Sequence, residues 1–366
     1  MRILNQTGFP TEFTMGMDVA GREYLSLVVK GTYDFPEDGA AEPAKAAEQR
    51  PPVRADEFTG APGYSATLWE TDFAFRKQRC DVVAQGAAYA PDGKPAERVR
   101  VGLKVGGWSK QFDVVGAREW RVVGPAITAT KPYPFRRMAF SYDTAFGGVD
   151  RLDPEDETPA AYDANPVGTG FSTVKNQSRL SGLALPNTEE AGQEIRSPYE
   201  AYRPMALGPI GRGWPERRRY AGTYDQDWQD NVFPFLPKDF DERYYQMAGA
   251  DQQIDPPRAG TPVIVAGMTP RGREQFRLPE TALPLKVFRG REVVFDDRRL
   301  PDTLAFDTEA RQVMLTWRIW IPMKRIITEF TEAWIGPPTD AMVRARDGGR
   351  AYIRDVSTGA TEEEEA

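Results

Sequence analysis

Residues 25–34 have the sequence Leu-Ser-Leu-Val-Val-Lys-Gly-Thr-Tyr-Asp. Successive side chains of a β-strand point to opposite faces, so a period of two separates one set of positions from the other. One face of this segment carries mostly apolar residues and the other mostly polar ones: Leu25, Leu27, Val29, Gly31 and Tyr33 against Ser26, Lys30, Thr32 and Asp34. We therefore expect a half-buried strand with the polar set on its outer face.

Further strand patterns precede and follow a central region. On the N-terminal side we expect strands at 64–75, 81–89, 99–105, 112–115 and 120–123. The turn signal Ala90-Pro91-Asp92-Gly93 predicts that the strands on its two sides form a hairpin. Strand patterns return at 263–266, 285–288, 293–295 and 313–321. Short strands at this spacing are typical of a sandwich or barrel.

The central region, residues 140–260, is dense in Gly, Pro, Asn, Asp and aromatic residues and has no sustained helical or strand period. Its many aromatic residues indicate that it packs against the rest of the protein. One short helix is expected to begin at Asp239 and to carry Phe240, Tyr244 and Tyr245.

These patterns predict a mainly β protein with two antiparallel β-sandwich or barrel-like units, a long loop-rich and aromatic-rich central region, and few short helices. The first unit spans residues 1–128, and the second spans 129–356 and carries the loop-rich insertion 140–260. The run Thr361-Glu362-Glu363-Glu364-Glu365-Ala366 belongs to an acidic tail, 357–366, that we expect to be disordered.

The charge balance argues against nucleic acid and membrane surfaces as partners. A chain of 366 residues with a net charge of -7 repels phosphate backbones and anionic headgroups. The first residues contain no apolar signal segment, and the most apolar window, 313–323, is interrupted by Thr316 and Arg318. The single cysteine, Cys80, is expected to be a buried thiol in a strand, which suits a reducing compartment. We therefore expect a cytoplasmic protein.

The chain contains no histidine. This removes the usual general base near neutral pH, the Ser-His and Cys-His nucleophile pairs, and zinc sites of the Cys and His type. The Gly-rich phosphate-binding patterns and the serine-hydrolase pattern are also absent from the sequence. We therefore predict a protein that is not an enzyme, with no cofactor, no metal and no catalytic residue.

Three loop segments have alternative interpretations. Residues 142–150, with paired glycines beside Phe146, fit a tight turn better than a backbone ledge for a ligand. The acidic loop 150–157 offers oxygen ligands for calcium, but its spacing lacks the glycine turn of a known calcium loop, and a solvated acidic loop is favoured. The glycines at 165–171 precede no helix, so they are interpreted as turns.

Carboxylates and aromatic residues recur together at 222–228, 234–241 and 250–253. This mixture leaves a second hypothesis open, a carbohydrate-active or other acid-base enzyme that uses Asp143, Asp225, Asp239 or Glu189. A structural role for these residues is favoured over the enzyme hypothesis. Aspartates in such loops commonly cap backbone N–H groups, and a Trp or Tyr side chain commonly anchors a loop.

Taken in order, these segments resemble a bacterial family, domain of unknown function 2169. The resemblance lies in 28–33, Thr71-Asp72, 86–93, 140–150, 165–171, 185–189, 222–228, 234–241 and 250–252. Members of that family accompany type VI secretion clusters. The resemblance implies a cytoplasmic adaptor or chaperone that binds an effector, its PAAR-like spike-tip domain or the spike protein, and helps to load the effector onto the secretion spike.

Residues of the ordered segments are the candidate partner contacts. We predict contacts at Tyr142, Phe146, Gly147, Gly148, Asn165, Phe171, Asn187, Glu189, Tyr224, Asp225, Trp228, Asp239, Phe240 and Asp251. The proposed mechanism is that these loops, together with an exposed strand edge, cover apolar client surface until the spike replaces them.

Overall fold

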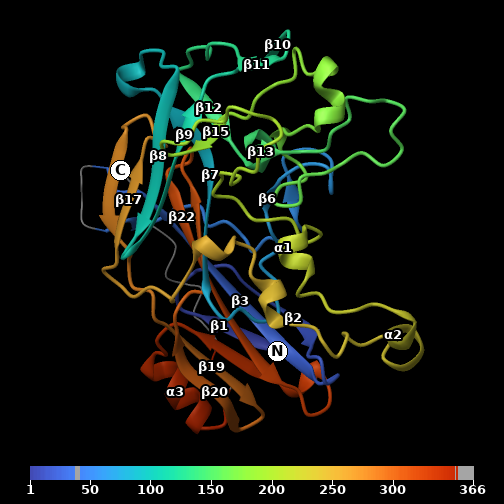
Figure 1. Ribbon diagram of the computed structural model, residues 1–366. Coiled ribbons are helices and arrows are strands. Elements are labelled where there is room, and N and C mark those ends of the chain that lie inside the picture. Colours follow the sequence, from blue (N-terminus) through green and yellow to red (C-terminus); the bar gives the residue numbers. More distant parts are fainter. Residues whose placement is uncertain (38–41, 351, 353–366) are drawn as a thin grey trace, which may run out of the picture.

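The computed structural model describes residues 1–37, 42–350 and 352. Sheets dominate it and the helices are short, so the prediction of a mainly β protein is confirmed (Figure 1). Three α-helices are present in these residues: α1 (Pro215–Arg218), α2 (Gln226–Asn231) and α3 (Asp340–Asp347). The predicted acidic tail, 357–366, lies outside the described residues.

An eight-stranded sheet forms the centre of the molecule. Along its main path it runs β12 (Arg137–Phe140), β7 (Cys80–Tyr89), β21 (Thr303–Asp307), β22 (Gln312–Pro322), β3 (Glu23–Asp34) and β2 (Thr11–Met17). Two short strands pair off this path, β16 (Gln253–Ile254) with β7 and β4 (Ala44–Lys45) with β3. The expected strand at residues 25–34 is therefore β3.

Two smaller sheets pack against this central sheet. A five-stranded sheet takes β15 (Thr188–Glu190), β9 (Trp108–Val115), β8 (Arg98–Val105), β17 (Pro262–Ala266) and β18 (Arg273–Arg277). A four-stranded sheet takes β1 (Arg2–Asn5), β23 (Glu332–Ile335), β19 (Leu283–Arg289) and β20 (Glu292–Arg299). Their apolar side chains and those of one face of the central sheet form one continuous core.

Three two-stranded sheets and several single turns of 3-10 helix complete the described elements. The small sheets join β5 (Glu57–Phe58) to β6 (Thr67–Trp69), β10 (Trp120–Val123) to β11 (Ala126–Ala129), and β13 (Phe146–Gly147) to β14 (Thr169–Gly170). The 3-10 turns are η1 (Pro91–Gly93), η2 (Tyr142–Thr144), η3 (Val174–Arg179), η4 (Glu242–Tyr245), η5 (Ala250–Gln252) and η6 (Ile327–Glu329).

Sheet pairing joins the two ends of the chain. β22 pairs with β3 in antiparallel register, from Gln312 opposite Asp34 to Pro322 opposite Tyr24. β21 runs parallel to β7, with Thr303 opposite Asp81. The predicted boundary at residue 128 therefore does not separate the strands into two sets of sheets, and parallel pairs occur where antiparallel ones were expected.

Three local predictions differ from the structure. The expected hairpin between 81–89 and 99–105 is wrong, because β8 pairs with β9 and β17. Within 64–75, only Thr67–Trp69 is a strand. The helix expected from Asp239 is a 3-10 turn, Glu242–Tyr245, that Asp241 caps.

The second face of β3 is buried as well as the first. Lys30 is 5% exposed and Thr32 is fully buried. Segments from 46–75 and 205–250 lie over this face and contribute side chains such as Trp69 and Met247 to a second apolar cluster. The expectation of a half-buried strand is corrected accordingly, because loops cover the face that carries the polar residues.

Candidate functional site

Asn165 holds together the turn that contains the paired glycines. Its side chain is fully buried, and its amide nitrogen Nδ2 donates to the carbonyl oxygens of Tyr142 at 2.8 Å and Phe146 at 3.1 Å. The backbone carbonyl oxygen of Asn165 accepts a hydrogen bond from the Gly148 N–H at 2.8 Å. Asn165 therefore satisfies backbone groups of a buried loop, as such groups require.

The backbone approaches so closely at positions 147 and 148 that both require glycine. Gly147 has a φ of 149° and Gly148 a φ of 104°, conformations that side chains disfavour. An added Cβ at Gly147 would lie 2.1 Å from the Asn165 carbonyl oxygen, and one at Gly148 would lie 2.4 Å from that of Gly168. The pair therefore shapes the interior of the loop region.

Glu189 is also internal. Its carboxylate is fully buried and forms ion pairs with Arg98 at 2.7 Å and Arg118 at 2.8 Å. One of its oxygens accepts a hydrogen bond from the Ile195 N–H at 3.1 Å. Nearby, Asn187 donates from its side chain to the Val115 carbonyl at 3.1 Å. Asn187 therefore fastens the loop region to β9, and Glu189 fastens it to Arg98 of β8 and to Arg118.

The aromatic candidates of the loop region pack inward. Phe146 is fully buried and meets Tyr162 and Tyr202 edge to face at centroid distances of 5.0 Å. Phe171 packs against the same cluster. Tyr142 meets Trp214 edge to face at 5.1 Å, and burial raises the pKa of its phenol. These rings stabilise the loop region: Tyr142 and Phe146 are buried, and Phe171 is partly buried.

The acidic loop 150–157 uses its carboxylates within the chain. Asp150 is almost completely buried and accepts hydrogen bonds from the Thr173 N–H and Oγ1 and from the Asn176 side chain. Asp153 pairs with Arg179 at 2.6 Å, and Asp156 pairs with Lys175 at 2.5 Å. Within the described residues, no group of three or more potential metal-ligating side chains is found.

A second group of candidates lies in a protruding segment, residues 220–241, which we call the α2 lobe. Asp225 caps α2 by accepting a hydrogen bond from the Trp228 N–H at 2.9 Å. The Trp228 indole donates to the Phe235 carbonyl at 2.9 Å. Asp239 closes the lobe by accepting from the N–H of Thr223 at 2.9 Å and from its hydroxyl at 2.7 Å. α2 lies well away from the sheets, at the right of Figure 1.

The α2 lobe exposes aromatic rings. Tyr224 is 53% exposed, Phe233 is 65% exposed and Phe235 is 42% exposed. The half-buried Trp228 lies between two of them, with centroid distances of 4.7 Å to Tyr224 and 5.6 Å to Phe233. Large apolar side chains gathered on a protruding loop are typical of a surface that binds another protein. Sequence reasoning named Tyr224 and Trp228 as contacts and missed Phe233 and Phe235.

A row of aromatic rings connects the α2 lobe to the central sheet. Phe240 packs on Tyr245 at 5.4 Å, Tyr245 lies 6.1 Å from Phe75, and Phe75 meets Tyr24 on β3 at 5.3 Å. Burial raises the pKa of the Tyr245 phenol to about 12. The candidate residue Phe240 is therefore part of the connection that positions the lobe on the sheet.

A buried ion pair fixes the base of the lobe. Arg217 donates from both terminal nitrogens to Glu70, at 2.5 and 2.9 Å, and both side chains are almost completely buried. Burial alone would raise the pKa of Glu70, but the charge of Arg217 outweighs it, so this pKa lies below its ordinary value. The Arg217 guanidinium also donates to the Tyr244 carbonyl at 2.8 Å.

The edge strand β2 runs close to the lobe. Its exposed side chains include Phe13 and Met15, and the turn that follows it contains Gly21, whose added Cβ would lie 3.3 Å from the Phe235 ring. In the described part of the chain, β2 has a strand neighbour on one side only, β3. An unpaired apolar edge is a site where another strand can add. The lobe and this edge together form the candidate partner-binding surface.

Asp251 lies apart from the lobe. It pairs with Lys110 at 3.0 Å and with Arg203 at 3.1 Å. Lys110 is largely buried, and burial lowers its pKa although Asp251 opposes the shift. The Trp108 indole donates to the Asp251 carbonyl oxygen at 2.5 Å. Asp251 therefore fastens the end of the loop region to β9.

The carboxylates considered for acid-base chemistry have structural partners. Asp143 accepts hydrogen bonds from the Thr59 hydroxyl at 2.6 Å and from the Ala66 N–H at 2.8 Å. Asp225 and Asp239 hold the turns of the lobe, and Glu189 is enclosed by two arginines. The four groups come from three separate regions of the structure, so they do not converge on a single reaction centre.

Comparisons with known proteins give one family. No helix in the described residues has the length and apolar character needed to span a membrane. No curated protein and no solved structure matches the chain. A family model described as "uncharacterized protein conserved in bacteria (DUF2169)" matches residues 20–318, which include the loop region, the α2 lobe and most of the central sheet. The chain therefore belongs to the DUF2169 family.

Proposed function

We propose that this protein is a cytoplasmic adaptor or chaperone. Its client is a type VI secretion effector or the PAAR-like spike-tip domain of one, which it helps to load onto the secretion spike. The proposal draws on the resemblance of the ordered segments to the family, to which the chain belongs. The observation that carries it is the α2 lobe, because Tyr224, Phe233 and Phe235 are exposed there together.

The lobe has the properties of a recognition element. Interface centres are enriched in Tyr, Trp and Phe, and rigid aromatic rings lose little conformational entropy on binding. Hydrogen bonds of Asp225, Trp228 and Asp239 fix the turns that present the rings. The buried pair Arg217–Glu70 fastens the base of the lobe to the scaffold. The lobe is thus organised before a client arrives, which lowers the cost of binding.

The hydrogen bonds and ion pairs of the candidate acids favour binding over acid-base catalysis. A general acid or base must reach a substrate proton, usually in a concave site. Glu189 is enclosed by Arg98 and Arg118, and Asp225 is used as a helix cap. Changing such groups is expected to alter stability or loop order before it alters any chemical turnover.

The test is recovery of a client encoded beside this protein, an effector or a PAAR-like protein, with the tagged full-length chain. The test variant carries Tyr224→Ser and Phe233→Ser, and the control carries Tyr64→Ser and Tyr133→Ser, which remove two aromatic rings that are 79% and 75% exposed elsewhere. Truncating one central aromatic contact costs about 2 kcal/mol or more, so the test variant is expected to bind the client at least about tenfold more weakly.

The control is expected to recover the client as the unchanged protein does. Equal recovery with the test variant would overturn the assignment of the lobe as the binding surface. Failure of the unchanged protein to recover any such client, at concentrations where both proteins are folded, would overturn the adaptor function itself.

A further inference from the structure

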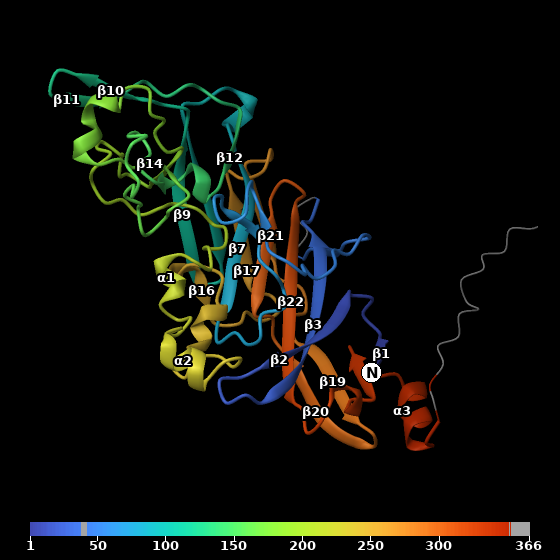
Figure 2. The same cartoon turned by 90° about the vertical axis from the view of Figure 1, so that its right-hand side faces the viewer.

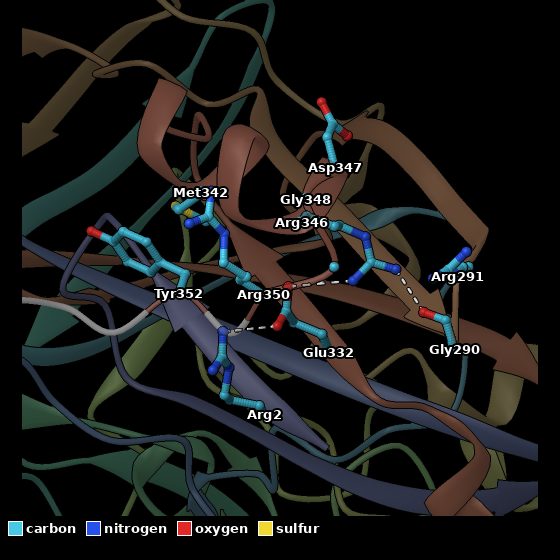
Figure 3. A pocket seen from close by; sticks show the side chains of 11 residues that line it. Arg2, Gly290, Arg291, Glu332, Met342, Arg346, Asp347, Gly348, Arg350 and Tyr352 are labelled. Atoms are coloured by element: carbon cyan, nitrogen blue, oxygen red, sulfur yellow. Dashed lines mark hydrogen bonds and ion pairs between the residues drawn. The ribbon is translucent and has the colours of Figure 1, made fainter.

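A cavity of about 650 Å³ lies beside α3 (Figure 3), on the side of the protein away from the α2 lobe (Figure 2). It is bounded by β1, β23, the turn between β19 and β20, and the end of α3. The charged residues that line it are Arg2, Arg291, Glu332, Arg346, Asp347 and Arg350, and Tyr352 also lines it. The cavity is separate from the proposed client surface, and its assignment does not depend on the proposed function.

The cavity is basic in an acidic protein. Four arginines against Glu332 and Asp347 give its lining a net charge of +2, whereas the whole chain carries -7. Guanidinium groups clustered in this way are the usual means by which proteins recognise carboxylates and phosphates, because each presents several donors in a plane. The local field therefore attracts anions that the rest of the surface repels.

Two of the arginines are already held in position. Glu332 pairs with Arg2 at 3.0 Å and lies 3.6 Å from Arg346. Arg346 also donates to the Gly290 carbonyl at 2.6 Å and stacks on the Phe288 ring, with its guanidinium carbon 3.4 Å from the ring centroid. Figure 3 shows Arg2 and Arg346 on either side of the Glu332 carboxylate, and the hydrogen bond from Arg346 to Gly290. These contacts fix the wall of the cavity, so its side chains lose little conformational freedom when an anion binds.

Two other arginines line the cavity without such contacts. Arg291 and Arg350 have no acidic side chain within ion-pair distance among residues 1–37, 42–350 and 352. Guanidinium groups remain charged at all ordinary pH values. Arg291 and Arg350 are therefore the donors available to a ligand carboxylate.

The sequence supplies a matching acidic segment a short distance along the chain. Residues 353–366 lie outside the described part and contain four consecutive glutamates, Glu362 to Glu365. Glu362 is ten positions after Tyr352, which itself lines the cavity, and ten residues of chain reach at most about 35 Å. A short tether of this kind gives an effective local concentration on the order of millimolar. The negative charge of this segment and its short connection to Tyr352 favour its binding in the cavity over that of an anion from solution.

We propose that the arginine-lined cavity is a carboxylate-binding site that takes Glu362 to Glu365 of the same chain. Occupancy by this segment neutralises Arg291 and Arg350. An acidic peptide of another protein has to displace the segment before it can use the same arginines. The site thus acts as a charge-selective contact for carboxylates.

The test uses the full chain with Ala366→Cys and a fluorophore on that cysteine. Cys80 is fully buried and burial raises the pKa of its thiol well above the ordinary value, so the label goes to one position. Replacing Arg291 and Arg350 by glutamine is expected to lower the fluorescence anisotropy of the label. Changing Glu362 to Glu365 into glutamines is expected to lower it equally. Raising the salt concentration is expected to weaken the contact.

A second measurement uses a labelled peptide of residues 357–366 and the full chain in which Glu362 to Glu365 are glutamines. The peptide is expected to bind, and Arg291→Gln with Arg350→Gln is expected to weaken its affinity about tenfold, as two partly exposed ion pairs allow. The matched control is Arg258→Gln with Arg325→Gln, because both arginines are exposed elsewhere on the surface. The control is expected to bind the peptide unchanged.

Equal peptide affinity in the Arg291/Arg350 variant and the Arg258/Arg325 control would overturn the proposal. So would a fluorescence anisotropy that stays the same when either the arginines or the glutamates are changed. Thermal unfolding of each variant shows whether α3 and its sheet remain folded. Reversing the charges of both the cavity and the peptide tests whether a variant loses binding for a reason other than charge. Arg291→Glu with Arg350→Glu is expected to abolish binding of the acidic peptide. A peptide that carries Glu→Lys changes at positions 362–365 is expected to bind that variant instead. Absence of this rescue would also overturn the proposal.

Discussion

Lys30 Nζ lies 2.8 Å from Asp72 Oδ2, and both side chains are almost completely buried between β3 and the loop that covers it. The other Asp72 oxygen lies 3.3 Å from Arg318 on β22 and 3.2 Å from the Thr316 hydroxyl. The Val53 N–H also donates to Asp72 at 2.8 Å. One carboxylate therefore joins two strands of the central sheet to the loop above them.

Asp72→Asn is expected to destabilise the protein strongly. It leaves the charge of Lys30 buried without its counter-charge and removes one of the two carboxylates that pair with Arg318, the other being Asp302. Breaking a buried pair on one side costs about 3–5 kcal/mol. Urea unfolding at neutral pH measures this free energy. The matched control is Asp255→Asn, whose exposed pair with Arg79 is expected to contribute less than about 1 kcal/mol. Equal effects of the two changes would contradict the structural role of Asp72.

The same carboxylate predicts a pH dependence of stability. Burial alone would raise the pKa of Asp72, but the charges of Lys30 and Arg318 hold it below its ordinary value of 3.8. A lowered folded-state pKa stabilises the folded protein above that value, and the contribution is lost as the pH falls below it. We expect the difference in unfolding free energy between the unchanged protein and Asp72→Asn to shrink below a pH of about 4.

The measurement is a urea titration series from neutral pH to about pH 3, spanning the ordinary pKa range of aspartate. Burial raises the pKa of the neighbouring Asp302, which acts in the opposite direction with pH. Comparing the two proteins at each pH removes this contribution, because Asp302 is present in both. A difference that stays constant down to the lowest pH would contradict the assignment.

Gly148→Ala is expected to destabilise the loop region more than Gly182→Ala. Both glycines have positive φ, 104° and 90°, so both substitutions strain the backbone. Only at Gly148 would the new Cβ meet a backbone oxygen, at 2.4 Å, whereas Gly182 has open space around it. The additional cost at Gly148 is expected to exceed about 1 kcal/mol, and chemical denaturation measures it. Similar losses at the two positions would show that the close approach has no energetic role.

Asp225→Ala is expected to loosen α2, while Asp225→Asn leaves it in place. Asparagine caps a helix about as well as aspartate, whereas alanine costs about 1 kcal/mol. Hydrogen exchange of the Trp228 amide, which donates to Asp225, reports this change locally. Protection that is lost equally in both variants would mean that the charge of Asp225, and not its capping bond, orders the lobe.

The sequence predicted most strands of the core because their own side chains carry the signal. The alternation in 25–33 and 313–321 marks the residues that face the core from β3 and β22. Burial of the second face was not predictable in this way, because Lys30 is neutralised by a residue 42 positions away. A strand period shows which side chains share a face, and it does not show what covers that face.

The partners of the strands were harder to predict from the sequence than the positions of the strands. The turn at 90–93 suggested a hairpin, but β7 instead takes β12, β16 and β21 as neighbours. β21, at Thr303–Asp307, was not predicted as a strand, since five residues carry little periodicity. Its parallel pairing with β7 depends on contacts between residues more than two hundred positions apart.

The candidate contacts divided into two groups for a physical reason. Asn, Glu and Phe beside glycine are suited to holding buried loops as well as to contacting partners, and Asn165, Glu189 and Phe146 do the former. Burial depends on the packing of distant segments, so the residue types alone could not separate the groups. Phe233 and Phe235, next to prolines in the α2 lobe, are exposed aromatic residues that became visible as a surface only in three dimensions.

The pairing of β3 with β22 also determines when the protein can fold during synthesis. Asp34 and its partner Gln312 are 278 positions apart in the chain. A ribosome adds roughly 5–20 residues per second, so β3 leaves it on the order of ten seconds to one minute before β22 does. During that interval the nascent chain carries an apolar strand without its neighbour. The central sheet is therefore completed only after β22 has left the ribosome, and a chain released before that point would expose β3.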